Sequence, residues 1–304
     1  MRWKKRVIIP VISFLFIVIV CIWYVNDYYH ADEKVQEYLQ KKEPVSVTEM
    51  SDGLYLDGPG DDTAMVFYPG AKVEYTAYLP LLSDLAEQGI DCFLIKMPCN
   101  LAFFGQNKSK KIMDYYEYDY WYLYGHSLGG SMSASYASGH LESLNGLVLL
   151  AAYPTKSLKS DSFSVLSLYG SEDGVLNMEK VEEGKAYMPA DYVEVCIEGG
   201  NHAQFGNYGE QKGDHAAGIS REEQQAQTVE AILNIMEAHK NQKQEEAMMS
   251  YEQISPQEAK ERMDKEADVI ILDVRTQEEY DSGHIKNAIC LPNEDILSEP
   301  DILP

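Results

Sequence analysis

Short apolar runs alternate with segments of helical apolar spacing along most of the 304-residue chain, and this alternation limits the folds that the chain can adopt. Such a pattern is typical of a mostly parallel sheet that helices cover on both faces. We therefore predict an α/β domain over residues 46–240. Its expected strands are 63–70, 91–98, 120–125, 144–154, 163–170 and 191–200, and its clearest expected helices are 75–90 and 222–240.

The first 25 residues have a different pattern. Basic residues at positions 2–6 precede an uncharged apolar run over residues 7–25, and acidic residues follow it. A membrane-spanning helix needs about 20 apolar residues, and basic residues favour the cytoplasmic side of a membrane. We predict a single-pass cell-membrane anchor over residues 1–25, with a cytoplasmic N-terminus, a juxtamembrane stalk over 26–45 and an extracytoplasmic main domain. A cleaved signal peptide is the alternative, although no small-x-small cleavage pattern follows the run.

Charge and cysteine spacing exclude several classes of function. The formal net charge of −24 argues against a nucleic-acid partner, because phosphate binding depends on Lys and Arg. The five cysteines have neither C-x-x-C nor Cys/His metal-ligand spacing. We therefore expect no metal site, no cofactor and no disulfide framework. The expected partners are a small-molecule substrate and the membrane, and protein partners and oligomeric state are left open.

The segment LYGHSLGG (123–130) places Ser127 between a strand-like run and a stretch of small residues. Glycines two positions before and after the serine allow a sharp strand-to-helix turn, on which a serine hydroxyl can act as a nucleophile. The positive end of the following helix favours the negative charge that develops during acyl transfer. A structural glycine turn is the alternative interpretation.

A nucleophilic serine needs a base, and in this arrangement an acid and then a histidine follow the serine along the chain. Asp173 lies in a loop after the run 163–170, and His202 lies in a glycine-bounded loop after the run 191–200. The carboxyl ends of parallel strands lie at one edge of a sheet, so we expect the side chains to meet. His215 is the alternative base, and Glu172 is the alternative acid.

An oxyanion site requires two N–H donors beside the serine. The backbone N–H of Leu128 directly follows the nucleophile. A second donor is expected in the loop after the run that ends in Tyr68-Pro69-Gly70, which points to the backbone of Ala71. We therefore predict the N–H groups of Leu128 and Ala71 as the oxyanion donors.

With these motifs in order, residues 46–240 resemble the α/β-hydrolase superfamily, and within it a compact bacterial branch related to dienelactone hydrolases. The resemblance implies an α/β-hydrolase fold with Ser127, Asp173 and His202 as the catalytic triad, and it names no substrate. The segment 101–119 is too short for a large lid, which predicts an open site for a small or accessible ester. The matching motifs are YPGAKVEYTAY (68–78), KMPCNLAFF (96–104), GHSLGG (125–130), GSEDG (170–174) and GNHAQFGNYGEQKGD (200–214).

After a predicted linker over 241–250, the C-terminal segment resembles the first half of a rhodanese-like domain. In that family the persulfide-forming cysteine lies in a later loop, whereas Cys290 lies in a strand-like run. We predict a partial α/β rhodanese-like segment over 251–304, of marginal stability and with no support for sulfurtransfer. The residues that match the family pattern are Asp273, Arg275, Glu279, Tyr280, Gly283, His284, Ile285 and Ala288.

The sequence therefore predicts a membrane-anchored serine hydrolase that cleaves a carboxylic ester, lactone or thioester through an acyl-enzyme. Two alternatives stay open. One is a non-catalytic surface binding or scaffold protein that keeps the hydrolase fold, because a fold does not guarantee chemistry. The other is a hydrolase fused to a rhodanese sulfurtransferase whose catalytic half is not in this sequence.

Overall fold

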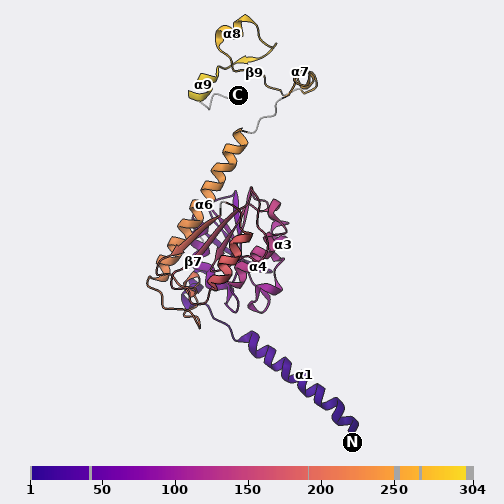
Figure 1. The fold of residues 1–304 in the computed structure, drawn as a ribbon, viewed down its shortest axis with the longest axis vertical. Helices are drawn as coiled ribbons and strands as arrows, with labels where there is room; N and C mark the ends of the chain where they lie inside the picture. The colour runs from indigo at the N-terminus through magenta and orange to yellow at the C-terminus, as the bar shows by residue number, and fades with distance from the viewer. Residues whose placement is uncertain (1, 41–42, 191, 250–253, 267–268, 299–304) are drawn as a thin grey trace. The chain divides into compact units, whose positions relative to one another are not determined.

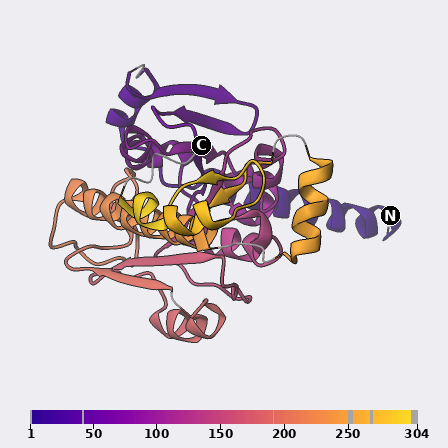
Figure 2. The ribbon, with the colours of Figure 1, turned by 90° about the horizontal axis from the view of Figure 1, so that it is seen from above.

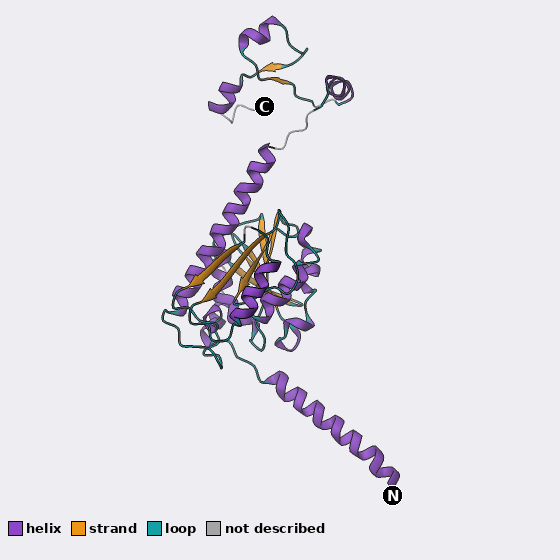
Figure 3. Cartoon of the chain, in the orientation of Figure 1, coloured by secondary structure: helices purple, strands orange, loops and turns teal. Residues whose placement is uncertain are grey.

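The computed structural model describes residues 2–40, 43–190, 192–249, 254–266 and 269–298. The chain divides into two compact units, Met1–Gln242 and Lys243–Pro304, and each is described by itself. The predicted boundary at residues 250–251 and the last residues, 299–304, lie outside the described residues. In the first unit, helices cover both faces of one large sheet (Figures 1 and 3).

The sheet is mostly parallel, as predicted, and its strand order is β1-β2-β4-β3-β5-β6-β7-β8. The β1–β2 and β2–β4 pairs are antiparallel, and all other pairs are parallel. Figure 2 shows the antiparallel pair at one edge of the sheet. The sequence analysis predicts six of these strands and misses β1 and β2. The bounds are β1 (Ser46–Met50), β2 (Gly53–Asp57), β3 (Thr63–Tyr68), β4 (Asp91–Ile95), β5 (Tyr120–His126), β6 (Gly146–Leu150), β7 (Ser164–Gly170) and β8 (Val193–Ile197).

The sheet separates two hydrophobic cores, and β5 contributes to both. Tyr122 and Tyr124 point into the core that contains α2 and α6, whereas Trp121 and Leu123 point into the core that contains α3 and α4. Successive side chains of a strand point to opposite faces, so a strand that is buried on both faces is apolar throughout. The last of the α-helices that cover this sheet, α6, also includes most of the predicted linker. The bounds of these helices are α2 (Leu79–Glu87), α3 (Lys108–Met113), α4 (Leu128–Ala137), α5 (Met178–Gly184) and α6 (Arg221–Met249).

The N-terminal helix α1 spans Arg2–Asn26. Crossing a bilayer as a helix requires about 20 consecutive apolar residues. Among the residues that the structure describes, no helix combines the length and the apolarity needed for this. The predicted membrane anchor over residues 1–25 is therefore wrong. The predicted cytoplasmic N-terminus and extracytoplasmic domain depended on that anchor.

Residues 27–40, which were predicted as part of a stalk, pack against other segments of the first unit. Tyr29 forms a parallel bridge with Val73. The N–H of Tyr29 donates to the carbonyl of Lys72 at 2.7 Å, and the N–H of Glu74 donates to the carbonyl of Tyr29 at 2.8 Å. The 3-10 helix η1 (Glu33–Gln40) then buries Val35 against the sheet's core. Through the bridge at Tyr29, this segment therefore lies beside the loop that follows β3.

The second unit has a small parallel sheet of β9 and β10 together with three helices. Capping boxes start two of the helices: Ser255 with Glu258, and Thr276 with Glu279. Loss of hydration and the nearby carboxylate of Asp273 raise the pKa of Cys290, whereas a reactive cysteine needs a lowered pKa. The bounds are α7 (Pro256–Lys265), β9 (Leu272–Asp273), α8 (Gln277–Ser282), β10 (Ile289–Cys290) and α9 (Asn293–Ser298).

Candidate active site

Ser127 lies alone between the end of β5 and the start of α4, in a sharp turn of the backbone. Its φ of 52° and ψ of −123° fall in a region that residues other than glycine rarely adopt, at a cost of about 1–3 kcal/mol. The turn is held by a hydrogen bond from the Ser127 N–H to the Leu150 carbonyl (2.8 Å) and by one from the Ser131 N–H to the Ser127 carbonyl (3.1 Å). Leu128 begins α4, so its N–H has no acceptor within the helix.

Gly129 explains why the turn requires glycine two residues after the serine. A Cβ atom at this position would lie 2.0 Å from the carbonyl oxygen of Tyr68 and 2.4 Å from that of Pro69. Both oxygens belong to the backbone and cannot move aside cheaply. The loop after β3 therefore rests directly on the first turn of α4, which brings the two segments predicted to form the oxyanion site into contact.

Asp173 and His202 form a buried pair. Asp173 follows β7, and His202 lies in the loop after β8, as predicted. Their side chains are each 1% exposed, and His202 Nδ1 lies 2.8 Å from Asp173 Oδ2. The other carboxylate oxygen, Oδ1, accepts the backbone N–H groups of Val175 (2.8 Å) and Leu176 (2.7 Å). A carboxylate can only accept hydrogen bonds, so the proton of the neutral imidazole belongs on Nδ1, and Nε2 is left free to accept another.

The second ring nitrogen of His202 is available for chemistry. Nε2 is buried and has no hydrogen-bond partner among the described residues, so no hydrogen bond joins it to the hydroxyl of Ser127. The rings of His202 and His126 lie 4.6 Å apart between centroids, and Ser127 is the next residue after His126. Catalytic hydrogen bonds are often long in unliganded enzymes and tighten in the substrate complex. The structure thus brings Asp173 and His202 into contact and places the Ser127 turn beside them, while their catalytic roles stay a prediction.

The two alternative residues occupy different environments. Glu172 links the acid loop to the histidine loop through its backbone, since its N–H donates to the carbonyl of Gly200 at 2.8 Å. His215 is exposed, and its carbonyl accepts the side-chain amide of Asn201 at 2.7 Å. Its side chain lines a cavity of about 380 Å³ formed largely by the loop that follows His202. The carboxylate that contacts the imidazole of His202 is that of Asp173.

Ala71 lies in the loop after β3, where both neighbouring N–H groups are occupied. The N–H of Gly70 donates to the hydroxyl of Tyr78 at 3.1 Å, and the N–H of Lys72 donates to the carbonyl of Asn100 at 2.8 Å. Within the part of the chain that the structure describes, the N–H of Ala71 donates to no protein group. The oxyanion role predicted for the N–H groups of Ala71 and Leu128 stays a prediction.

Tyr78 and His126 form a second buried pair beneath the site. Burial raises the pKa of Tyr78, so its hydroxyl stays protonated. Because this hydroxyl already accepts the N–H of Gly70, its proton points to Nδ1 of His126, which lies 2.8 Å away. Burial, followed by the neighbouring His202 ring, holds the pKa of His126 well below its ordinary value. His126 is therefore a neutral residue that links the oxyanion loop to the serine turn.

Two residues beside the candidate site, Tyr78 and Asp214, were not predicted from the sequence. Tyr78 lies within a predicted helix, where a tyrosine is ordinary core material. Asp214 is the last residue of the matching motif GNHAQFGNYGEQKGD (200–214), which also contains His202, but no role was assigned to it. Its carboxylate accepts backbone N–H groups from the loops that carry Asp173 and His202, and only the folded structure shows this.

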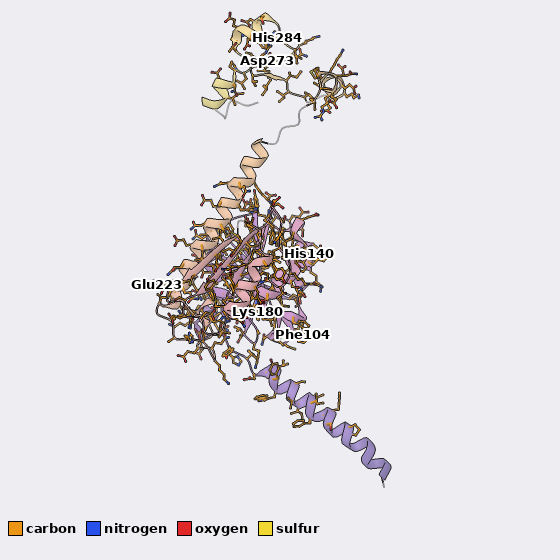
Figure 4. The ribbon with its side chains drawn as sticks, viewed as in Figure 1. Phe104, His140, Lys180, Glu223, Asp273 and His284 are labelled. Atoms are coloured by element: carbon orange, nitrogen blue, oxygen red, sulfur yellow. The ribbon has the colours of Figure 1, made fainter. Side chains whose placement is uncertain are left out.

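Two exposed aromatic side chains lie in the loop after β4, on a turn that contacts α4. Phe103 and Phe104 follow β4 and are 68% and 59% exposed. Their 3-10 turn, η4 (Ala102–Phe104), contacts α4, the helix that begins after Ser127. Figure 4 shows Phe104 and Lys180, which follow different strands of the parallel part of the sheet, towards the same end of the first unit.

Comparisons with known proteins identify the family of the main domain and of the C-terminal segment. A model of the alpha/beta hydrolase family matches residues 64–226, more than half of the chain. A model of the rhodanese-like domain matches residues 255–303. Both resemblances expected from the sequence are therefore confirmed. A comparison with curated proteins found no match.

Solved structures with similar folds include three hydrolase-like proteins. A predicted CIB-like hydrolase from Thermoplasma acidophilum has 16% identity and a TM-score of 0.47, over 62% of this chain and 99% of that chain. The carboxylesterase CesB from Bacillus subtilis has 11% identity and a TM-score of 0.41, over 55% and 89%. Alpha/beta hydrolase domain-containing protein 10 from mouse has 12% identity and a TM-score of 0.48, over 64% and 98%. The family model, which covers more than half of the chain, shows that the protein belongs to the alpha/beta hydrolase family.

Proposed function

We propose that the protein is a serine hydrolase that cleaves a carboxylic ester, lactone or thioester. One observation carries the proposal: the Asp173 carboxylate lies on Nδ1 of His202, and Nε2 of the same ring is buried and unpartnered beside the Ser127 turn. This is the arrangement that a proton-accepting imidazole needs. The free N–H groups of Leu128 and Ala71 support it, since a developing oxyanion needs such donors.

In the first half of the proposed reaction, Ser127 Oγ attacks the acyl carbon and passes its proton to His202 Nε2. The carbonyl oxygen becomes negative and accepts the N–H groups of Leu128 and Ala71. The bond from the acyl carbon to the leaving oxygen or sulfur then breaks, and His202 gives its proton to that atom. The product of this half is an ester between the acyl group and Ser127.

In the second half, His202 takes a proton from water, and the resulting hydroxide attacks the acyl carbon. The carbon–Oγ bond breaks, Ser127 regains its proton from His202, and the carboxylic acid leaves. Asp173 stays ionised throughout and holds the imidazole in one tautomer and one orientation. No group outside the chain and the substrate is needed except water.

Replacement of the nucleophile tests this proposal. Ser127→Ala should lower kcat on p-nitrophenyl esters by roughly 10⁶-fold, because a triad without its nucleophile keeps only binding and oxyanion stabilisation. Ser131→Ala is the matched control, since Ser131 lies one turn further along α4 and its hydroxyl bonds the Tyr153 carbonyl. A fluorophosphonate probe should label the wild type and Ser131→Ala but not Ser127→Ala. A folded wild type that neither turns over esters nor takes the label would instead support the scaffold alternative.

Substrates of increasing acyl-chain length test which class of ester the enzyme prefers. A series of p-nitrophenyl esters from acetate upward, with lactones and thioesters alongside, compares acyl groups of increasing size at one leaving group. We propose that the exposed rings of Phe103 and Phe104 form an apolar rim of the site, which favours apolar acyl or alcohol groups over charged ones. Rates that fall at once beyond acetate would contradict an accessible apolar rim.

A further inference from the structure

Asp214 is the most heavily used hydrogen-bond acceptor near the candidate site. Its Oδ1 accepts the backbone N–H groups of Gly174 (3.0 Å), His202 (3.3 Å) and His215 (3.0 Å). Its Oδ2 accepts the N–H of Ala203 at 2.8 Å. The side chain is half-buried in the loop that follows His202. A carboxylate offers about four acceptor positions, and here four backbone donors converge on it, three on Oδ1 and one on Oδ2.

The donors come from the two loops that carry the acid and the base. Gly174 directly follows Asp173, and Ala203 directly follows His202. The Asp214 carboxylate therefore ties the backbone of Gly174 to the backbone of His202 and Ala203. Two further hydrogen bonds link the loops: the N–H of Glu172 donates to the carbonyl of Gly200 at 2.8 Å, and Ser171 Oγ accepts the N–H of Gly199 at 2.8 Å. Asp214 is the link that reaches the residues directly after the acid and the base, Gly174 and Ala203.

We infer that Asp214 is a positioning residue, which holds the loops of Asp173 and His202 in the register that makes their side chains meet. The inference rests on the proposed function of that pair. Among the described residues, Asp214 accepts hydrogen bonds from backbone N–H groups and from neither the His202 imidazole nor the Ser127 hydroxyl, so it acts through the two loops. An acid–base pair must be held to within about 0.5 Å of its working geometry. Three charge-assisted hydrogen bonds, from the backbone of Gly174, His202 and Ala203, are a direct means of doing so.

Asp214→Asn removes this function with the smallest change of shape. The amide keeps one acceptor oxygen, and its NH₂ group cannot accept a hydrogen bond. Whichever way the amide turns, at least one backbone N–H loses its acceptor and faces another donor. A displacement of about 1 Å in a catalytic pair costs on the order of 100-fold in rate. We therefore expect kcat to fall about 100-fold while KM stays within about 3-fold.

Asp91 supplies the matched control. It is 2% exposed, and its carboxylate accepts the N–H of Gly58 (2.9 Å), the hydroxyl of Tyr55 (2.7 Å) and the hydroxyl of Tyr118. It begins β4, so it lies at the edge of the parallel strands opposite the site. Asp91→Asn should therefore destabilise the fold and leave kcat and KM unchanged.

A readout beside activity separates this inference from the proposed function. In the folded wild type, the proton on His202 Nδ1 that bonds Asp173 should give a low-field ¹H NMR signal. His202→Gln assigns the signal by removing it. Asp214→Asn should shift this signal upfield or broaden it beyond detection, whereas Asp91→Asn should keep it in place.

The measured kcat and the NMR signal together test the role of Asp214. Loss of kcat and of the signal in Asp214→Asn, with both kept in Asp91→Asn, supports the inference. Wild-type kcat and signal in Asp214→Asn overturn it, and so do equal losses in the two variants, because the cause would then be general loosening. If Asp214→Asn does not fold, Asp214→Glu, which moves both oxygens by one methylene, decides by the same two readouts. If the wild type hydrolyses no ester, the proposed function fails, and the NMR comparison alone decides for or against Asp214.

Discussion

The hydroxyl of Tyr78 lies 2.8 Å from Nδ1 of His126 and also accepts the backbone N–H of Gly70. This one oxygen joins the loop that carries Ala71 to the residue that precedes Ser127. A buried donor or acceptor that loses its partner costs about 1–3 kcal/mol. The relationship therefore contributes to stability, and it sets where the Ala71 loop lies relative to the serine turn.

Tyr78→Phe should reduce both stability and turnover. Removal of the hydroxyl leaves the Gly70 N–H and His126 Nδ1 unsatisfied, and we expect the free energy of unfolding to fall by about 2–4 kcal/mol. Since the oxyanion loop loses its link to the turn, kcat should fall by about 10-fold or more. Urea unfolding and ester kinetics measure the two effects.

Tyr122→Phe is the control for this prediction. Tyr122 forms an equivalent buried pair with Nδ1 of His239 at 3.0 Å, on the same face of the sheet but near the start of β5. Its loss should lower stability comparably and leave kcat unchanged. Equal losses of kcat in both variants would count against a special role for Tyr78.

Stability should depend on pH through His126. The pKa of this ring is lowered in the folded state, first by burial and then by His202, and the side chain is 0% exposed. Below the ordinary histidine value of about 6.5, the unfolded chain binds a proton that the folded chain does not. The free energy of unfolding should therefore fall with falling pH, by up to about 1.4 kcal/mol per pH unit from this residue.

His126→Gln should remove that contribution and flatten the dependence between about pH 6.5 and pH 5. Urea unfolding across this range measures it. His140→Gln, at a half-buried site beyond α4, should keep the wild-type slope. The same slope in all three proteins would contradict a suppressed charge on His126.

Asp173→Asn should abolish most turnover with little change in substrate binding. The asparagine amide can donate towards Nδ1, which leaves the imidazole in the wrong tautomer, and in a Ser-His-Asp enzyme this change costs about 10⁴-fold in kcat. Glu172→Gln is the neighbouring control and should stay within about 3-fold of the wild type. Steady-state kinetics on one p-nitrophenyl ester compares them. The opposite ranking would make Glu172 the acid.

Tyr29 should restrain the loop that follows His202. Its ring lies 5.7 Å from that of Tyr208, and its hydroxyl accepts the N–H of Lys212 at 3.1 Å. An aromatic pair and one hydrogen bond are each worth about 0.5–1.5 kcal/mol. Tyr29→Ala should therefore speed amide hydrogen exchange over residues 207–215 by about 10-fold or more.

Hydrogen-exchange mass spectrometry measures this effect. Tyr28→Ala is the control, because the Tyr28 ring contacts only the neighbouring side chain of His30, at 4.3 Å between centroids, among the ring pairs of the described residues. Equal exchange rates in the two variants would show that residues 27–32 only cover the loop and do not restrain it.

Much of the fold followed from local pattern. β3 to β7 are predicted because strands buried on both faces are largely continuous apolar runs between turn residues. β8 is a half-exposed edge strand, and the alternation of apolar and polar residues in VEVCI predicts it instead. β1 and β2 are missed because SVTEM and GLYLD are short and mixed, and they become strands by pairing at the edge of the sheet. The anchor over residues 1–25 is the clear error, since no described helix is long and apolar enough to cross a membrane.

By itself, the sequence determined the order of the parts: a strand, the Ser127 turn, Asp173 after one strand and His202 after the next. Chain order is enough for this, because parallel strands carry their following loops to one edge of the sheet. Only the tertiary structure decided that Asp173 rather than Glu172 reaches His202, that Tyr78 bonds His126, and that Asp214 ties two loops together. These are hydrogen bonds of 2.8 Å between residues 11 to 48 positions apart, and no local pattern in a sequence specifies such distances.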